Sequence, residues 1–293
     1  MLAALLAAAL VAPAGDFKTE VVETIVKPDR TEYLLKFPSA LKSPWPANDM
    51  VWAHLSVPRS AEGKRGPAVL VLPVMAAPNV WIETQFVDRF VRDGLVTMWV
   101  EMPTQFHRRP HPSMPSGQVF LARTAKGLAR NFRQSVSDAR RAFGVLAARP
   151  EVDGGRVALF GISLGAIVGS VAWSVDPRPR AGMFLLGGAD FPGLALGGSL
   201  SGPFARKMGI KPEDLRSAWK DLDPLDYKAA NAGKRAFLVN ARSDTVIPRA
   251  NAISLKEAFP DSRQVWVPLG HYSAIAHLIW LPRWVSRRIR DAL

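Results

Sequence analysis

The chain contains no cysteine among its 293 residues. This absence excludes disulfide bonds, a thiol nucleophile and any zinc site built from cysteine thiolates. A chain without cysteine is compatible with an oxidising and with a reducing compartment, so the compartment has to be inferred from other features.

Long apolar runs are also missing. A membrane-spanning helix needs about 20 apolar residues, so we expect no integral membrane segment. The N-terminal run, residues 2–11, is shorter and is followed by Ala12-Pro13-Ala14, which has the form of a signal peptidase site. Residues 1–14 are therefore predicted to be a signal peptide for export to the periplasm or the exterior, although no Lys or Arg precedes the run. An ordinary N-terminal helix in a cytoplasmic protein is the alternative.

Negative charge is scarce: 25 Asp and Glu stand against 38 Lys and Arg, which gives a formal net charge of +13. Such a balance brings nucleic acids and acidic ligands into consideration. However, residues 101–150 alone hold nine Lys or Arg and two acids, mostly at the spacing of one helix's solvent face. The sequence contains no helix-turn-helix, RNA-recognition or zinc motif, so we expect no nucleic-acid partner.

Internal repeats and low-complexity linkers are absent as well, and 48% of the residues are hydrophobic. The chain can therefore bury a large core, and residues 15–293 are predicted to form one domain. Three extended segments separated by turn residues open it as antiparallel strands: residues 21–26, 32–37 and 51–57. Later apolar runs are typical of parallel strands covered on both faces: residues 68–74, 95–100, 156–161, 182–186, 236–240 and 264–267.

Two stretches between these runs have distinct patterns. Apolar residues recur at spacings of three and four from Leu121 to Leu146, which predicts a long helix with one buried face. Its opposite face carries basic residues, namely Arg123, Lys126, Arg130, Arg133 and Arg140. Residues 191–233 interrupt the alternation with Gly-rich and short helical pieces, and are predicted to form a cap-like insertion over the carboxyl edge of the sheet.

The most informative motif is Gly161-Ile162-Ser163-Leu164-Gly165, which lies directly between an apolar run and a helical stretch. A sharp turn from strand to helix strains the backbone of its central residue and needs small neighbours, which Gly161 and Gly165 supply. Ser163 is therefore a candidate nucleophile near a helix N-terminus, where free N–H groups can stabilise an oxyanion.

A serine nucleophile needs a base and an orienting carboxylate, and both follow at the ends of later strands. Asp244 comes after the run 236–240, and His271 comes after the run 264–267. Carboxyl ends of strands are where open α/β sheets bind ligands, so we expect Ser163, Asp244 and His271 to meet there.

From about Gly66 onward the sequence resembles the α/β-hydrolase superfamily, in particular its dienelactone hydrolase-like and acyl-ester hydrolase branch. The resemblance is strongest over residues 138–169, DARRAFGVLAARPEVDGGRVALFGISLGAIVG. It implies the α/β-hydrolase fold, with an eight-stranded, mostly parallel sheet and helices on both faces. It also implies that Ser163 attacks, His271 acts as base and then acid, and Asp244 orients the imidazole.

The second oxyanion donor departs from the pattern of the family. Members often place His-Gly after the strand concerned, whereas this chain has Leu72-Pro73-Val74-Met75. By position the N–H of Met75 would join that of Leu164 in the oxyanion hole, with Val74 as the next candidate.

Each candidate has a competitor. Ser163 could cap the helix that follows it, and Asp244 could be an ordinary turn residue. Asp190 is a rival acid after an earlier strand, and His277 is more typical of a packed residue of the terminal helix. His107 and His111 could ligate a metal, but without a nearby carboxylate a substrate-facing loop is favoured, and no metal is expected.

These residues predict a serine hydrolase that cleaves a small-molecule carboxylic ester through an acyl-enzyme, with no metal or organic cofactor. Positive charge at Arg108 and Arg109, next to the predicted site, favours an anionic ester. A peptidase of the prolyl-oligopeptidase type, or a binding module that has lost catalysis, remain as alternatives. The oligomeric state is not determined by the sequence.

Overall fold

The computed structural model describes residues 17–76 and 78–293, and these residues form one sheet of nine strands. The predicted opening strands are β1 (Glu20–Val26), β2 (Arg30–Pro38) and β3 (Met50–Pro58), which pair antiparallel in that order. Six strands parallel to one another follow: β4 (Gly66–Leu72), β5 (Val96–Val100), β6 (Val152–Ile162), β7 (Ala181–Leu185), β8 (Ala236–Ala241) and β9 (Arg263–Val267). The spatial order is β1-β2-β3-β5-β4-β6-β7-β8-β9. The predicted signal peptide, residues 1–14, lies outside the described residues.

The expected count of eight strands is wrong, because β1 adds a ninth at the edge. All seven residues of β1 are exposed, so this strand is held by its ladder with β2 rather than by burial in the core. The remaining strands follow the predicted segments: β2 and β3 correspond to the extended opening segments, and β4 to β9 to the later apolar runs.

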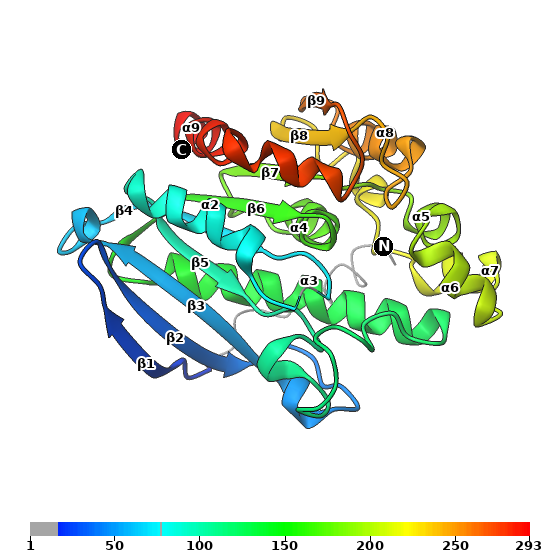
Figure 1. Cartoon of the computed structure of the whole chain (residues 1–293), viewed down its shortest axis with the longest axis horizontal. Coiled ribbons are helices and arrows are strands. Elements are labelled where there is room, and N and C mark those ends of the chain that lie inside the picture. Colours follow the sequence, from blue (N-terminus) through cyan, green and yellow to red (C-terminus); the bar gives the residue numbers. More distant parts are fainter. Residues whose placement is uncertain (1–16, 77) are drawn as a thin grey trace.

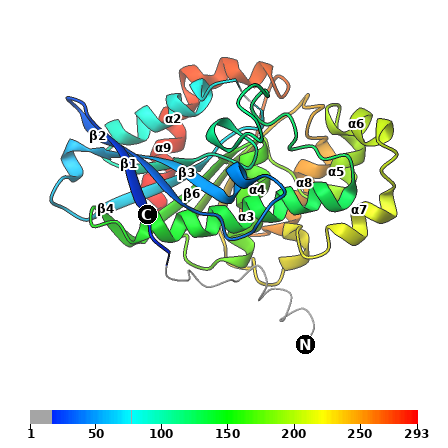
Figure 2. The same ribbon diagram turned by 90° about the horizontal axis from the view of Figure 1, so that it is seen from below.

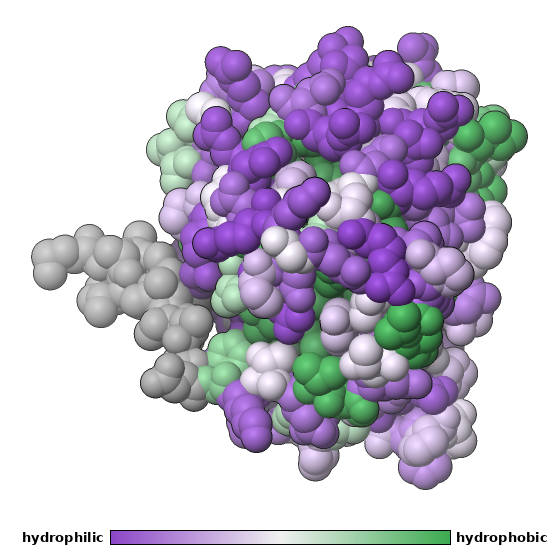
Figure 3. Space-filling view, turned by 90° about the vertical axis from the view of Figure 1, so that its left-hand side faces the viewer, coloured by the Kyte–Doolittle hydropathy of each residue, from purple (hydrophilic) through white to green (hydrophobic). Residues whose placement is uncertain are grey.

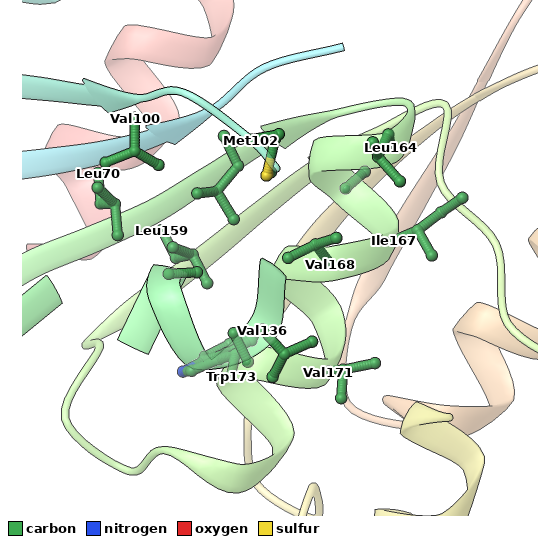
Figure 4. Packing of buried hydrophobic residues seen from close by; sticks show 14 of the residues in the cluster. Leu70, Val100, Met102, Val136, Leu159, Leu164, Ile167, Val168, Val171 and Trp173 are labelled. Carbon is green, nitrogen blue, oxygen red and sulfur yellow. The ribbon is translucent and has the colours of Figure 1, made fainter. Parts of the chain in front are cut away.

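Helices cover both faces of the sheet (Figure 1). One face packs against α2 (Trp81–Arg92) and α9 (Leu281–Ala292). The other packs against α3 (Ala125–Ala147), α4 (Leu164–Val175) and α8 (Arg249–Ala258). Figure 4 shows this second layer, in which Val168 and Val171 of α4 lie close to Val136 of α3.

The long helix α3 starts later than its pattern predicts. The side chain of Thr124 accepts a hydrogen bond from the N–H of Gly127 at 3.1 Å, so the helix is capped there and Leu121 lies before it. The basic face is not uniformly solvated. Arg123 and Lys126 are exposed, but Arg140 is half-buried and pairs with Asp176 at 3.3 Å.

Residues 191–233 include three short helices that lie at the end of the molecule opposite the β1–β2 hairpin (Figures 1 and 2). These are α5 (Phe191–Gly197), α6 (Ser201–Lys207) and α7 (Pro212–Ala218). The opposite end, seen in Figure 3, is mainly hydrophilic, with hydrophobic residues in small separate groups. Within residues 17–76 and 78–293, no helix combines the length and apolarity needed to cross a membrane.

Candidate active site

Ser163 lies at the turn between β6 and α4, in a strained conformation. Its φ of 53° and ψ of −115° are unusual for a residue with a side chain. The flanking glycines have no room for a methyl group. A Cβ on Gly161 would lie 2.2 Å from the carbonyl oxygen of Gly165, and a Cβ on Gly165 would lie 2.0 Å from that of Leu72. The turn therefore exists only with glycine at both positions.

The structure brings the three predicted residues together. Ser163 Oγ lies 2.9 Å from His271 Nε2, and His271 Nδ1 lies 2.7 Å from Asp244 Oδ2. The other oxygen of Asp244 accepts the backbone N–H groups of Val246 and Ile247 at 2.9 and 2.8 Å. Because Oδ1 is held in this way, Oδ2 is left to fix one tautomer of the imidazole, with its proton on Nδ1.

The rival residues make other contacts, although His277 borders the same cavity as Ser163 and His271. Asp190 is exposed and caps α5 by accepting the N–H of Gly193 at 3.2 Å. His277 belongs to a 3₁₀ segment, η5 (Ser273–Ile279), rather than to the terminal helix as expected, and accepts a hydrogen bond from the indole N–H of Trp280 at 3.2 Å.

The loop after β4 is held by two side chains that the sequence did not single out. Glu83 of α2 accepts the N–H of Val74 through Oε1 at 2.8 Å, and Gln105 donates from Nε2 to the carbonyl of Val74 at 2.8 Å. Burial raises the pKa of Glu83, and the hydrogen bond from Val74 opposes that rise. Because the N–H of Val74 is engaged, Met75 is the better candidate for the second oxyanion donor. A carboxylate in the first turn of a helix is common, so no distinctive sequence signal marks Glu83.

Two apolar cavities adjoin Ser163. The larger, of about 620 Å³, is bounded by Ile82 and Phe86 of α2 and by Leu278 and Leu281 near α9. The smaller, of about 100 Å³, lies between α3 and the inserted helices, against Phe132, Phe191 and Trp219. Among the described residues, those lining either cavity include no Lys, Arg, Asp or Glu.

The expectation that Arg108 faces the site is wrong. Its side chain is fully buried and pairs with Asp138 of α3 at 2.6 Å. Arg109 instead lines a separate surface hollow together with His107. The view that the loop histidines lack a nearby carboxylate is also wrong for His107, whose Nδ1 lies 2.7 Å from Glu101 Oε1. His111 bonds to Ser113 within its own loop.

Comparison with solved structures shows what fold the chain has. An acetyl xylan esterase from Paenibacillus sp. R4 matches with a TM-score of 0.67 at 15% identity, over 100% of this chain and 94% of that one. Acetyl xylan esterase 1 from Thermoanaerobacterium sp. JW/SL YS485 gives 0.69 at 17%, over 94% and 91%. An S-formylglutathione hydrolase from Agrobacterium tumefaciens gives 0.61 at 15%, over 92% and 99%. The chain has the α/β-hydrolase fold. No family model and no curated protein sequence matches it.

Proposed function

We propose that this protein is a serine hydrolase that cleaves carboxylic esters. The observation that carries the proposal is the continuous chain of contacts from Ser163 Oγ to His271 Nε2, at 2.9 Å, and from His271 Nδ1 to Asp244 Oδ2, at 2.7 Å. Nucleophile, base and orienting acid within hydrogen-bond reach of one another are what acyl transfer requires. The neighbours in structure include several esterases, which agrees with this chemistry.

In the first step, Ser163 attacks the ester carbonyl while His271 takes its proton through Nε2. The negative oxygen of the tetrahedral intermediate is held by the N–H of Leu164, at the start of α4, and by that of Met75. Each such donor stabilises the transition state by about 3 kcal/mol. His271 then protonates the departing alcohol, and the acyl group stays on Ser163.

In the second step, water replaces the alcohol. His271 removes a proton from this water, which attacks the acyl carbonyl, and the same two N–H groups hold the second oxyanion. The carboxylic acid leaves and Ser163 regains its proton. The carboxylate of Asp244 stabilises the imidazolium in both steps without being protonated itself.

The cavities favour an ester that is uncharged and apolar on both sides of the carbonyl. Their linings hold no Lys or Arg among the described residues, and burying a carboxylate there without a cationic partner of that kind would be costly. This argues against the anionic substrate that the Arg108 and Arg109 sequence favours.

Replacement of Ser163 tests the proposal. Ser163→Ala should lower kcat on a p-nitrophenyl ester by at least about 10⁴-fold and abolish labelling by a fluorophosphonate. Ser201→Ala is the matched control, because Ser201 also borders the smaller cavity but donates to the carbonyl of Leu194. Undiminished turnover in Ser163→Ala would overturn the proposal. Failure of the wild type to react with the fluorophosphonate would instead favour a binding module without catalysis.

Amide cleavage is the second candidate, because an acylaminoacyl peptidase from Pyrococcus horikoshii matches with a TM-score of 0.67 at 13% identity. That match covers 95% of this chain but 50% of the peptidase, so half of the peptidase has no counterpart here. Comparing kcat/KM for a p-nitrophenyl ester and the p-nitroanilide of the same acyl group separates the two. A larger value for the anilide would favour the peptidase.

Export is a separate proposal that rests on residues 2–11 and on the Ala12-Pro13-Ala14 site. N-terminal sequencing of the protein recovered from outside the cytoplasm should begin near Gly15. A cytoplasmic protein that keeps its first residues would contradict it.

A further inference from the structure

Two histidines and a glutamate meet where β3 lies beside β5. His54 is on β3, Glu101 follows β5 directly, and His107 is in the 3₁₀ segment η3 (Phe106–Arg108). Both rings reach the same carboxylate oxygen: Glu101 Oε1 lies 3.1 Å from His54 Nε2 and 2.7 Å from His107 Nδ1. These three atoms all lie within 4.8 Å of one another.

The surroundings hold this cluster in a fixed geometry. The Glu101 side chain is 1% exposed, and its second oxygen accepts the backbone N–H of His107 at 2.9 Å. The ring of His54 stacks on Trp99 with centroids 3.7 Å apart, and the ring of His107 stacks on Trp52 at 4.3 Å. Side chains that are already ordered lose little entropy when they bind a ligand.

The geometry points to a binding site for a divalent transition-metal ion such as Zn²⁺, and we propose that His54, Glu101 and His107 ligate it. Ligands at about 2.1 Å in a tetrahedral arrangement are about 3.4 Å from one another, so the two observed contacts need to lengthen by about 0.7 Å or less. The two imidazole nitrogens, which lie within 4.8 Å of each other, need to take up the same separation. The His54 and His107 side chains are 31% and 48% exposed, which leaves the fourth position open to water. Imidazole ligands favour Zn²⁺ over Mg²⁺ or Ca²⁺, which prefer oxygen.

The ion would stabilise the fold and would not contact the reacting atoms. None of the three ligands is among the described residues that line the cavities at Ser163. However, Gln105 lies between Glu101 and His107 in the sequence, and its side chain donates a hydrogen bond to the carbonyl of Val74. A metal at this point would tie β3 to the segment that supports the loop of Met75.

Metal binding to the chelator-treated full chain tests this site. Isothermal titration with Zn²⁺ should give one ion per chain, and Zn²⁺ at about 100 times its Kd should raise Tm by about 5 °C, whereas Mg²⁺ should not. His107→Gln should weaken Zn²⁺ binding at least tenfold while the amide can still donate to Glu101. His111→Gln is the matched control on the same loop and should bind as the wild type does.

Three results would overturn the assignment. The first is that the wild type binds no Zn²⁺ in the micromolar range. The second is that His107→Gln and His111→Gln bind Zn²⁺ equally well. The third is that His271→Gln loses Zn²⁺ binding, which would place the ion at the candidate active site. Ester hydrolysis is measured separately in each variant, so a failure of the metal site leaves the proposed activity of Ser163 untouched.

Discussion

Glu83 is a buried carboxyl that holds the loop of Met75 by a hydrogen bond and whose protonation affects stability. One oxygen accepts the N–H of Val74, while Oε2 has no hydrogen-bond partner among the described residues. Burial raises its pKa above the ordinary value of 4.5. The folded protein therefore binds this proton more tightly than the unfolded chain, and its free energy of unfolding falls as the pH rises from near 4.5 through the raised pKa.

Glu83→Gln should remove that part of the pH dependence, because glutamine keeps an acceptor for Val74 and carries no charge. Urea unfolding between pH 4 and 8 measures the effect. The variant should be at least as stable as the wild type at pH 8 and keep its kcat. Glu83→Ala, which frees the N–H of Val74, should lower kcat by about 10-fold or more. Identical pH profiles for wild type and Glu83→Gln would contradict this account.

The two candidate acids make a matched pair. Asp244→Asn should lower kcat by roughly 10⁴-fold, because an amide donates a hydrogen bond where the imidazole needs an acceptor and so favours the wrong tautomer. Asp190→Asn should leave kcat unchanged, since asparagine also caps a helix. Steady-state hydrolysis of a p-nitrophenyl ester distinguishes them, and a large loss in Asp190→Asn would assign the acid to the other loop.

At the scale of elements, Arg108 joins three parts of the chain. Its guanidinium donates to the carbonyls of Asn48 in η1 (Pro46–Asp49) and Glu101 at 2.7 and 2.8 Å, and it pairs with Asp138 of α3. This pair is almost completely excluded from solvent, so removal of one partner leaves an uncompensated charge inside the protein.

Arg108→Met should therefore cost about 3–5 kcal/mol of unfolding free energy, measured by urea denaturation. Arg123→Met, at an exposed position before α3, is the control and should change stability by about 0.5 kcal/mol or less. A loss below about 1 kcal/mol in Arg108→Met would mean that the buried ion pair has little net effect.

The elements themselves were largely predictable, and the exceptions have local causes. The strands could be located because continuous apolar runs mark a sheet covered on both faces. The start of α3 was placed too early, because periodicity alone does not reveal that Thr124 caps the helix. The strand count was wrong because the resemblance implied eight, whereas β1 pairs at the edge without burying a face.

Over the whole molecule, the net charge of +13 does not predict which charged side chains lie at the candidate active site. Among the described residues, the linings of the cavities beside Ser163 contain no Lys, Arg, Asp or Glu. Several of the arginines in residues 101–150 are instead engaged in ion pairs within the fold, as for Arg108, Arg140 and Arg149. The excess of positive charge therefore says little about the substrate.

A neutral ester should be preferred over one of the same length that ends in a carboxylate, by about tenfold or more in kcat/KM, because the charged end loses its hydration in an apolar cavity. Paired p-nitrophenyl esters of a monocarboxylic acid and of the corresponding dicarboxylic acid provide the comparison. Equal values for the two would indicate that the charged end stays in solvent or meets Arg109.

The sequence by itself determined the strand segments and the strained turn at Ser163, because each of these depends on neighbours within a few positions. It also showed that Ser163, Asp244 and His271 each follow a predicted strand. The tertiary structure alone decided which strands pair, that Arg108 is buried, that Glu83 occupies the N–H of Val74, and that His54, Glu101 and His107 converge. These are contacts between segments far apart in the chain. Their energies depend on burial and on distances of a few ångströms, which no local pattern encodes.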